Sequence, residues 1–323
     1  MSEAPRPRLR LRPATPRAAL RRAFGEVVSE RSLLVLGTFD GVHGGHRALI
    51  GHAVRLAHEI EKPWLPVAFF PPPKTLLAGQ PFLSTEAEKR ELLEEAGEEA
   101  GSAPAEIVIV PFDESVAATP AERFVASLAG LTPSAIVVGE DFRFGRDRRG
   151  TTAQLALATA RLEVLPLVSL GGEVVKSSAI REALEAGEVE RTAELLGAPY
   201  RVTGPVVEGH RRGRTIGVPT ANVALDPRKA LPTGVFAVLV DLPDGARRGG
   251  MANLGARPSF DDPSASLEVH VFDFSGDLYG AEITVHVIAR LRGQQRFPDL
   301  GALQRQLELD AAAARERLAQ APA

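Results

Sequence analysis

The sequence predicts an α/β fold with a parallel sheet, followed by a small antiparallel β-barrel and a terminal α-helix. From Leu33 to about Leu167, short apolar runs alternate with helical stretches. Beyond Tyr200, the apolar runs are separated by Gly, Pro and Asp turns, and the last stretch, Leu300–Ala319, has a helical pattern. Strands that alternate with helices indicate a parallel sheet with crossover helices, whereas closely spaced strands and turns are typical of a barrel.

The first half of the chain contains five expected strands with helices between them. The strands are Leu33–Leu36, Trp64–Phe70, Glu106–Val110, Ala135–Gly139 and Leu162–Leu167, and the helices include Arg47–Glu59, Thr85–Ala96 and Pro120–Ala129. Thr85 and Glu88 have the spacing of a capping box. Ligands of such sheets bind beyond the carboxyl ends of the strands, where Gly37–His46, Phe70–Pro73 and Gly139–Gly150 all lie.

The second half begins with two short helices, Ser178–Ala186 and Val189–Leu196, and Gly197-Ala198-Pro199 ends the second of them. The expected barrel strands are Val202–Val207, Gly234–Val240, Arg248–Leu254, Leu267–Phe272 and Glu282–Leu291. We therefore expect an N-terminal extension over residues 1–30, a first domain over 31–187, a linker over 188–199 and a barrel domain over 200–323.

Composition excludes several classes of protein. The chain has 323 residues and a formal net charge of -3, which gives no electrostatic reason for nucleic acid as the main partner. No run approaches the ~18 apolar residues of a membrane span. The absence of cysteine excludes disulfides and thiolate metal sites. We expect a cytoplasmic protein that binds neither nucleic acid nor membrane, with its Arg- and Pro-rich first residues as a flexible or edge-strand extension.

The turn Gly37–His46 is the most informative segment. It lies between an apolar strand and a helix, where free backbone N–H groups and the helix dipole favour an anion. His43 and His46 are three residues apart, so they project from one side of the turn and the first helical residues. This combination indicates a site that holds a triphosphate while it is cleaved. An ordinary turn with solvent-facing histidines stays open as the alternative.

A second candidate site lies in the barrel. The basic, glycine-rich segment Arg211–Asn222 ends in a strand, and on an extended chain Thr220 and Asn222 point the same way. Both offer the hard oxygens that Mg²⁺ takes alongside phosphates, although a basic hairpin loop would look similar. Glu268 alternates with Leu267 and Val269 and so faces away from the core. It is either a solvated carboxylate or the acceptor of a proton from an attacking hydroxyl.

Together these residues resemble the bacterial bifunctional riboflavin kinase/FAD synthetase family. Gly37–His46 matches its G-x-F-D-G-V-H-x-G-H signature, Val138–Gly145 matches V-G-x-D-F-x-F-G, Gly217–Asn222 matches G-x-P-T-A-N, Asn253–Phe260 is similar to N-x-G-x-R-P-T-F, and Leu267–His270 matches L-E-V-H. The resemblance runs from about Leu33 to the C-terminal helix. It covers both expected domains in the family's order.

The resemblance implies a Rossmann-like nucleotidyltransferase domain, a barrel of the riboflavin kinase type and two ATP-dependent reactions. In the barrel, riboflavin would attack the γ-phosphate of Mg-ATP to give FMN. Glu268 would be the base, and Thr220 and Asn222 would position Mg²⁺ and the phosphates. In the first domain, the FMN phosphate would attack the α-phosphate of a second ATP to give FAD and pyrophosphate. His43 and His46 would bind the phosphates and stabilise the transition state.

The same resemblance implies the remaining site residues and partners. The nucleotide- and phosphate-binding residues would be Gly37, Phe39, Asp40, Gly41, Gly45, Ser177, Ser178, Arg181, Gly213, Gly217, Thr220 and Asn222, and the flavin-binding residues Asp141 and Phe142. The small-molecule partners would be riboflavin, FMN and ATP, with Mg²⁺ as the cofactor. The oligomeric state is not set by the sequence, so a homo-oligomer stays open.

Two alternatives remain at this point. A cytidylyl- or pantetheine-type nucleotidyltransferase would share the first turn, but it would not explain Pro219–Asn222 or the Glu268 strand. A degenerate first domain attached to an active kinase, or a flavin-responsive regulator, would fit two departures from the family's pattern. These are Lys176, where serine is usual, and Pro72, where a polar residue is usual.

Overall fold

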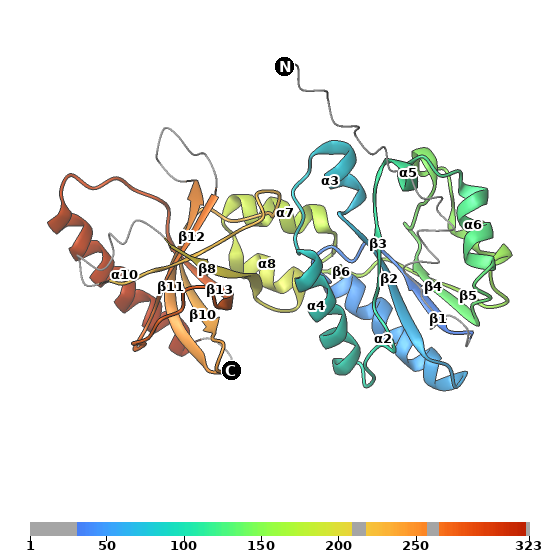
Figure 1. Ribbon diagram of the computed structural model, residues 1–323, viewed down its shortest axis with the longest axis horizontal. Helices are drawn as coiled ribbons and strands as arrows, with labels where there is room; N and C mark the ends of the chain where they lie inside the picture. Colours follow the sequence, from blue (N-terminus) through green and yellow to red (C-terminus); the bar gives the residue numbers. More distant parts are fainter. Residues whose placement is uncertain (1–30, 209–217, 257–264, 321–323) are drawn as a thin grey trace, which may run out of the picture. The chain divides into compact units, whose positions relative to one another are not determined.

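The computed structural model describes residues 31–208, 218–256 and 265–320, which form two compact units (Figure 1). The sheet unit comprises residues 31–38, Leu49–Leu77 and Glu94–Leu167, and the barrel unit comprises Phe39–Ala48, Ala78–Leu93 and the described residues from Val168 onward. Neither unit is continuous in sequence. The turn that carries His43 and His46 belongs, by its packing, to the barrel unit.

The sheet unit is built on a five-stranded parallel sheet in the order β3-β2-β1-β4-β5. Its strands are β1 (Leu33–Leu36), β2 (Trp64–Phe70), β3 (Val108–Pro111), β4 (Ala135–Gly139) and β5 (Leu162–Leu165). The predicted parallel sheet is confirmed, with the bounds of β3 and β5 differing from expectation by one or two residues. Because the strand order reverses beside β1, the carboxyl ends of β1 and β4 form the switch point at which such sheets bind ligands.

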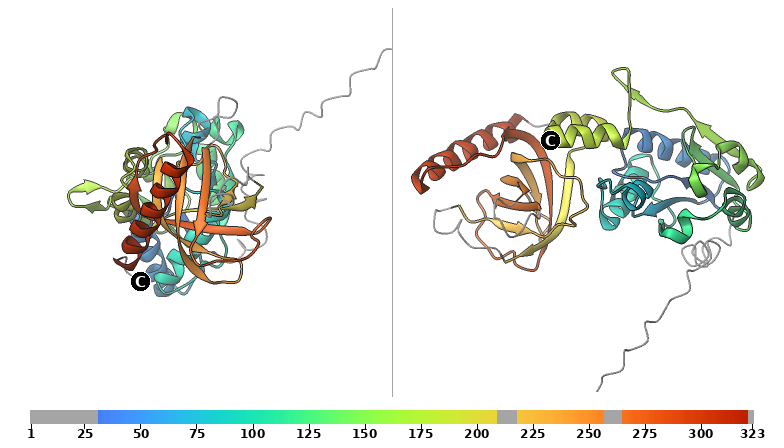
Figure 2. Two further views of the ribbon diagram at one scale, coloured as in Figure 1. Left: turned by 90° about the vertical axis from the view of Figure 1, so that its left-hand side faces the viewer. Right: turned by 90° about the horizontal axis from the view of Figure 1, so that it is seen from above.

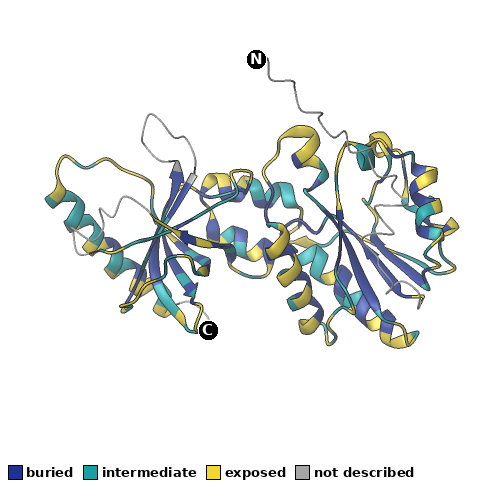
Figure 3. Ribbon diagram, viewed as in Figure 1, coloured by how far each residue is buried: buried dark blue, intermediate teal, exposed yellow. Residues whose placement is uncertain are grey.

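Helices cover both faces of this sheet. The connections β1–β2 and β3–β4 run in opposite directions along it, so right-handed crossovers place α2 (Gly44–Glu59) and α6 (Ala121–Ala129) on opposite faces. β1 is buried along its whole length (Figure 3).

The other elements are α3 (Pro73–Ala78), α4 (Glu86–Glu99), α5 (Glu114–Ala117) and the 3₁₀ turns η2 (Arg146–Arg148) and η3 (Thr152–Leu157). No helix in the described ranges is long and apolar enough to cross a membrane.

Local hydrogen bonds decide where two of the helices begin. The Arg47 N–H donates to His43 O (3.0 Å), so α2 begins at Gly44, three residues before the expected start. The two glycines that open it are poor helix formers, which is why the pattern placed the start later. At α4, Glu88 N–H donates to Thr85 Oγ1 (3.2 Å) and Thr85 N–H donates to the Glu88 carboxylate (2.8 Å). The predicted capping box is therefore confirmed.

The barrel unit contains a closed antiparallel barrel in the order β10-β11-β12-β9-β8-β13. Its strands are β8 (Tyr200–Val207), β9 (Ala221–Val223), β10 (Gly234–Asp241), β11 (Arg247–Ala256), β12 (Ala265–Val271) and β13 (Glu282–Arg292). The predicted barrel is thus confirmed. Alternate residues such as Val202, Phe236 and Val269 fill its interior.

The hairpin β6 (Ser169–Leu170) and β7 (Glu173–Val174) and the helices α7 (Ser177–Ala186) and α8 (Val189–Leu196) precede the barrel. Gly187 and Gly197 end these two helices with left-handed backbone conformations (φ 74° and 82°), which glycine adopts without steric cost. The predicted helix stop at Gly197 is confirmed.

The terminal helix α10 (Leu300–Gln320) lies along the outside of the barrel (Figure 2). Ala314 packs against Met251 and Ala289 on the outward face of the strands. Arg292 of β13 also makes a two-pronged bond to the nearly buried Asp310, with Nε to Oδ1 at 3.0 Å and Nη2 to Oδ2 at 2.7 Å. The helix is therefore anchored by one apolar patch and one mostly desolvated ion pair.

Replacing Asp310 by Asn should lower the free energy of unfolding by on the order of 3 kcal/mol, because it leaves the Arg292 charge without its buried partner. Asp273 provides a matched control. Its two oxygens accept from Arg315 of α10 (2.9 and 3.0 Å), but both side chains are more than half exposed. Asp273→Asn should therefore cost much less stability than Asp310→Asn. Equal losses in urea unfolding would contradict this account of how α10 is held.

Candidate functional sites

The turn after β1 has an unusual backbone. Phe39, Gly41 and Val42 all have positive φ (50°, 83° and 42°). Such values are strained for any residue with a Cβ, above all for a β-branched valine. Gly41 is also required for space, because a Cβ there would lie 3.0 Å from Leu83 Cδ1. A turn of this kind persists only where its surroundings fix it.

The Asp40 side chain provides most of that fixation. Its Oδ1 accepts from the backbone N–H groups of Leu83 (2.8 Å) and Ser84 (3.4 Å), and its Oδ2 accepts from Arg181 Nη2 (2.9 Å). Asp40 is 1% exposed. The carboxylate predicted to bind phosphate is thus turned toward donors of the protein itself.

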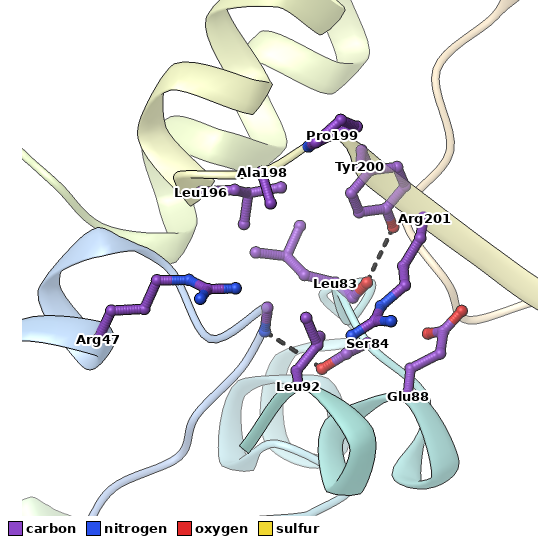
Figure 4. Close-up of a pocket in the computed structure, with 11 residues that line it drawn as sticks. Arg47, Leu83, Ser84, Glu88, Leu92, Leu196, Ala198, Pro199, Tyr200 and Arg201 are labelled. Atoms are coloured by element: carbon purple, nitrogen blue, oxygen red, sulfur yellow. Dashed lines mark hydrogen bonds between the residues drawn. The ribbon is translucent and has the colours of Figure 1, made fainter. Parts of the chain in front are cut away.

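Two further bonds hold the turn. Gly41 N–H donates to Ser84 Oγ (3.1 Å; Figure 4), and Ser177 Oγ donates to the Asp40 carbonyl (3.1 Å). Arg181 Nε donates in addition to Pro81 O (2.7 Å). The structure therefore joins the turn, the segment around Leu83 and the start of α7, which brings together four of the predicted phosphate-binding residues.

His43 and His46 project from this turn as a stacked pair. Their ring centroids are 3.7 Å apart with an interplanar angle of 18°, and the Phe39 ring lies 5.1 Å from His46. A Cβ at Gly45 would lie 3.3 Å from the His43 ring, so glycine leaves room for the stack. The Nδ1 atoms of both histidines are buried and have no hydrogen-bond partner among the residues that the structure describes. Each ring therefore has one buried nitrogen whose hydrogen bond the described residues leave unmade.

The environment keeps both imidazoles neutral. Burial lowers the pKa of His43 to about 4, with a smaller contribution from Arg181, and burial, His43 and Lys89 lower the pKa of His46 well below its usual value. Burial also lowers the pKa of Lys89 to about 8, while Asp40 and Glu86 oppose this. At pH 7 the fixed positive charge comes mainly from Arg181 and Lys89. Neutral imidazoles each keep one N–H donor for a phosphate oxygen.

The first turn of α7 is a second place for an anion. Lys176 occupies the N-cap position with no capping bond from its side chain, and the Ser177 hydroxyl is used by Asp40. The first backbone N–H groups of α7, including that of the half-buried Ser178, therefore lack a side-chain cap. Such N–H groups favour phosphate.

Three predicted site residues lie in the sheet unit. Gly37 N–H donates to Val67 O (3.2 Å), which extends the pairing of β1 with β2. After β4, Asp141 is exposed, whereas the Phe142 ring lies 5.9 Å from Phe144 and packs against the core. The Asp141 side chain is thus accessible to a ligand, and the Phe142 ring is partly buried against the core.

The barrel aligns three polar side chains in one row across neighbouring strands. Glu268 of β12 pairs with Asn222 of β9 on one side and with Asn253 of β11 on the other. Directly opposite residues of antiparallel strands point to the same face. Because Leu267 and Val269 fill the interior, the row faces outward, as predicted for Glu268. Asn253 was not among the predicted site residues, although it opens a segment that the sequence had singled out.

Neighbouring contacts hold this row and the chain beside it. His270 Nδ1 donates to Pro219 O (2.8 Å), which fixes the backbone just before the half-buried Thr220. Gln294 Nε2 donates to Leu254 O (3.3 Å) and Asn253 Oδ1 (3.4 Å), so the Asn253 amide is oriented. Gly213 and Gly217, predicted to bind phosphate, lie outside the described residues.

A pocket of about 510 Å³ opens beside Thr220. It is lined mainly by apolar residues, among them Val206, Val271 and Phe274, with Asp277 and Tyr279 supplying polar atoms. Small-molecule sites typically combine apolar walls with a few placed polar groups.

Comparison with known proteins assigns both halves of the chain. A FAD synthetase family model matches residues 26–179, and a riboflavin kinase family model matches residues 196–318. A relative from Pseudomonas fluorescens is 37% identical over 287 residues, covering 87% of this chain and 91% of the relative. One from Escherichia coli K12 is 36% identical over 304 residues, covering 91% and 95%. Both are named bifunctional riboflavin kinase/FMN adenylyltransferase. This chain belongs to that family.

A solved structure shares the architecture of this bifunctional family member. It is titled a macrolide-efflux protein from Streptococcus pneumoniae, and it is 32% identical, with a TM-score of 0.77 over 89% of this chain and 94% of that one. The curated relatives carry the riboflavin kinase/FMN adenylyltransferase name instead, in agreement with the two family models. The alternative of a different nucleotidyltransferase class is wrong, because a riboflavin kinase model matches the second half.

The two departures from the family's pattern lie at the ends of helices. Lys176 is exposed at the N-cap of α7, next to the uncapped N–H groups of that helix. Its side chain therefore does not displace any group of the buried turn. Pro72 is buried, and its carbonyl accepts from Thr75 N–H (2.9 Å) at the start of α3. In this position proline removes no hydrogen bond from a helix interior.

The neutral state of His43 predicts a pH dependence of stability. The pKa of about 4 lies below the ordinary value of 6.5, so the unfolded chain binds the proton more tightly than the folded one. The folded state therefore keeps its full stability above pH 6.5, where the unfolded chain is also neutral at His43, and loses stability as the pH falls toward 4 and the unfolded chain takes up the proton. Between pH 7 and pH 5, His43 should account for a loss of about 2 kcal/mol.

Urea unfolding of the wild type and of His43→Gln at both pH values measures this loss. The variant should lose less stability on acidification than the wild type, and the exposed His58→Gln should behave as the wild type. Identical losses in wild type and His43→Gln would show that His43 is not held neutral by the fold.

Proposed function

We propose that this chain makes FAD from riboflavin in two ATP-dependent reactions at two separate sites. The kinase reaction converts riboflavin and ATP to FMN and ADP. The adenylyl transfer joins FMN to the AMP part of a second ATP and releases pyrophosphate. The observation that carries the proposal is that one chain holds both the stacked-histidine turn and the Asn222–Glu268–Asn253 row, in segments matched by separate FAD synthetase and riboflavin kinase models.

In the kinase reaction, the 5′-hydroxyl of the ribityl chain attacks the γ-phosphorus of ATP and loses its proton to Glu268. The half-buried carboxylate lies between two asparagines, whose amides orient the substrate hydroxyl and the phosphates. The oxygens of Thr220 and Asn222 fit Mg²⁺, which usually takes few protein ligands together with substrate phosphates. When bound there, Mg²⁺ neutralises charge on the transferred phosphoryl group. The pocket beside Thr220 accepts the nucleotide base.

In the adenylyl transfer, an oxygen of the FMN phosphate attacks the α-phosphorus of ATP, and pyrophosphate leaves. Negative charge grows on the bridging oxygen and the pyrophosphate as the bond breaks. The N–H groups of His43 and His46 bind these oxygens, while Arg181 and Lys89 supply positive charge from behind the turn. The uncapped start of α7 adds backbone N–H donors. Positioning and electrostatic stabilisation suffice, and no covalent enzyme intermediate is needed.

The absence of cysteine from the chain fits a reducing compartment. We therefore place the enzyme in the cytoplasm, where it handles riboflavin, FMN and ATP as free small molecules.

Single substitutions should separate the two reactions. Glu268→Gln should lower FMN formation from riboflavin by roughly 10²- to 10⁴-fold, since it removes the general base, while FAD formation from supplied FMN should continue. Glu282→Gln, in an exposed position on β13, is the matched control and should leave both reactions intact. The products are resolved by chromatography after incubation with ATP and Mg²⁺.

His46→Ala should have the opposite effect in the same assay. FAD formation should fall by roughly 10²- to 10³-fold because a donor to the leaving group is lost, and FMN should accumulate. His58→Ala is its control on the same helix. If each substitution removed both products equally, the two-site proposal would be wrong. If the wild type made FMN but no FAD, the degenerate first domain would be the better account.

A further inference from the structure

A fully buried ion pair in the barrel unit has no part in either reaction as described above. Glu88 at the start of α4 and Lys229, in the connection between β9 and β10, are 2.5 Å apart, and their side chains are 0–1% exposed. Desolvating two charges costs several kcal/mol each, so such a pair contributes little net stability compared with apolar residues. The contacts of the pair indicate a role in positioning the backbone.

The pair fixes one carbonyl group. Lys229 Nζ donates to Leu83 O (2.8 Å) as well as to Glu88, and Tyr200 Oη lies 2.9 Å from the same carbonyl and 2.6 Å from Ala230 O. Burial, together with the charges of Glu88 and Asp40, raises the pKa of Tyr200 well above its usual value, so the hydroxyl keeps its proton and donates. Its bond to Leu83 O is shown in Figure 4.

Both backbone polar groups of Leu83 are therefore held. Its C=O accepts from Lys229 and Tyr200, and its N–H donates to Asp40 Oδ1 (2.8 Å). Asp40 in turn fixes the strained turn that carries the two stacked histidines, and binds Arg181. A continuous chain of hydrogen bonds thus runs from Lys229 through Leu83 to Asp40, in the turn that carries the imidazoles.

The pocket beside this contact offers no competing explanation as a ligand site. Its empty space is about 320 Å³, and apolar side chains such as Leu83, Leu92 and Leu196 form much of its wall. Figure 4 shows Ser84 and Tyr200 bonded to protein partners around it, and the Glu88 carboxylate is taken up by Lys229. These side chains organise the turn and the Leu83 segment.

We propose that Lys229, a residue of the barrel connection, is a positioning residue for the adenylyl transfer. By holding Leu83 O, it sets the Leu83 N–H against Asp40 and thereby keeps His43 and His46 where the phosphates of ATP bind. The inference rests on the proposed function, and it makes the second reaction depend on a side chain far from its reacting atoms. Misplacing catalytic groups by about 1 Å lowers a rate up to 10²-fold.

The test uses Lys229→Met in the full chain, with kcat and KM measured for both reactions in the same preparation. The kcat of FAD formation should fall ~10- to 100-fold, with the kinase reaction unchanged, and Lys229→Arg should restore part of the loss because it keeps a cationic donor. The kinase row lies in the same barrel unit, so its activity reports whether that unit is folded. Arg228→Met is the matched control, since Arg228 is the exposed neighbour that binds Asp226.

Tyr200→Phe provides a second, milder variant that leaves the ion pair intact and removes the hydroxyl that Leu83 O and Ala230 O share. It should lower the kcat of FAD formation less than Lys229→Met does, again without changing the kinase reaction. If Lys229→Met does not fold, the kcat values of Tyr200→Phe test whether the bonds to Leu83 O support FAD formation. Unchanged FAD formation in either folded variant, or equal losses of both reactions in both, would overturn the proposal. A wild type that makes no FAD would instead overturn the adenylyl transfer itself.

Discussion

The buried carboxylate of Asp40 is the constraint on which the histidine site depends. Its oxygens accept two backbone N–H groups and one guanidinium, which is the condition under which a carboxylate can be removed from water. Three neighbouring residues of the turn have positive φ, each with a strain of order 1–3 kcal/mol where a side chain is present. Without Asp40, Gly41 alone in the turn's own sequence would favour that backbone, and the strain at Phe39 and Val42 would be unopposed. The stacked imidazoles are therefore a product of long-range contacts.

The barrel site is built by a different principle. Strand register alone places Asn222, Glu268 and Asn253 side by side, because paired residues of antiparallel strands share a face. A one-residue slip would move Glu268 into the apolar interior, so the core residues on either side protect the register. Thus the kinase row depends on the barrel core, whereas the adenylyl-transfer turn depends on a few polar contacts, among them those of Lys229.

These two principles also determine what could be predicted from the sequence. The parallel sheet, the barrel, the outward face of Glu268 and the Thr85–Glu88 capping box all follow from local patterns and are confirmed. Asp40 was expected to bind phosphate because it lies in the signature turn, but the direction of its carboxylate depends on Leu83 and Arg181, 43 and 141 residues away. Lys89 and Lys229 carry no local signal: Lys89 lies among acidic residues, which ordinarily indicates a solvated surface, and Lys229 follows Arg228 in a connection between strands.

Hydrogen exchange at the Leu83 amide tests the central role of Asp40 most directly. In the wild type this amide should be strongly protected, because its donor bond is buried and ends on a charged acceptor. In Asp40→Ala its exchange should accelerate by roughly 10- to 100-fold, the equivalent of a bond to a charged group worth about 1.5–3 kcal/mol, while the amides of β10 keep their wild-type protection. Equal protection of Leu83 in both proteins would contradict the account.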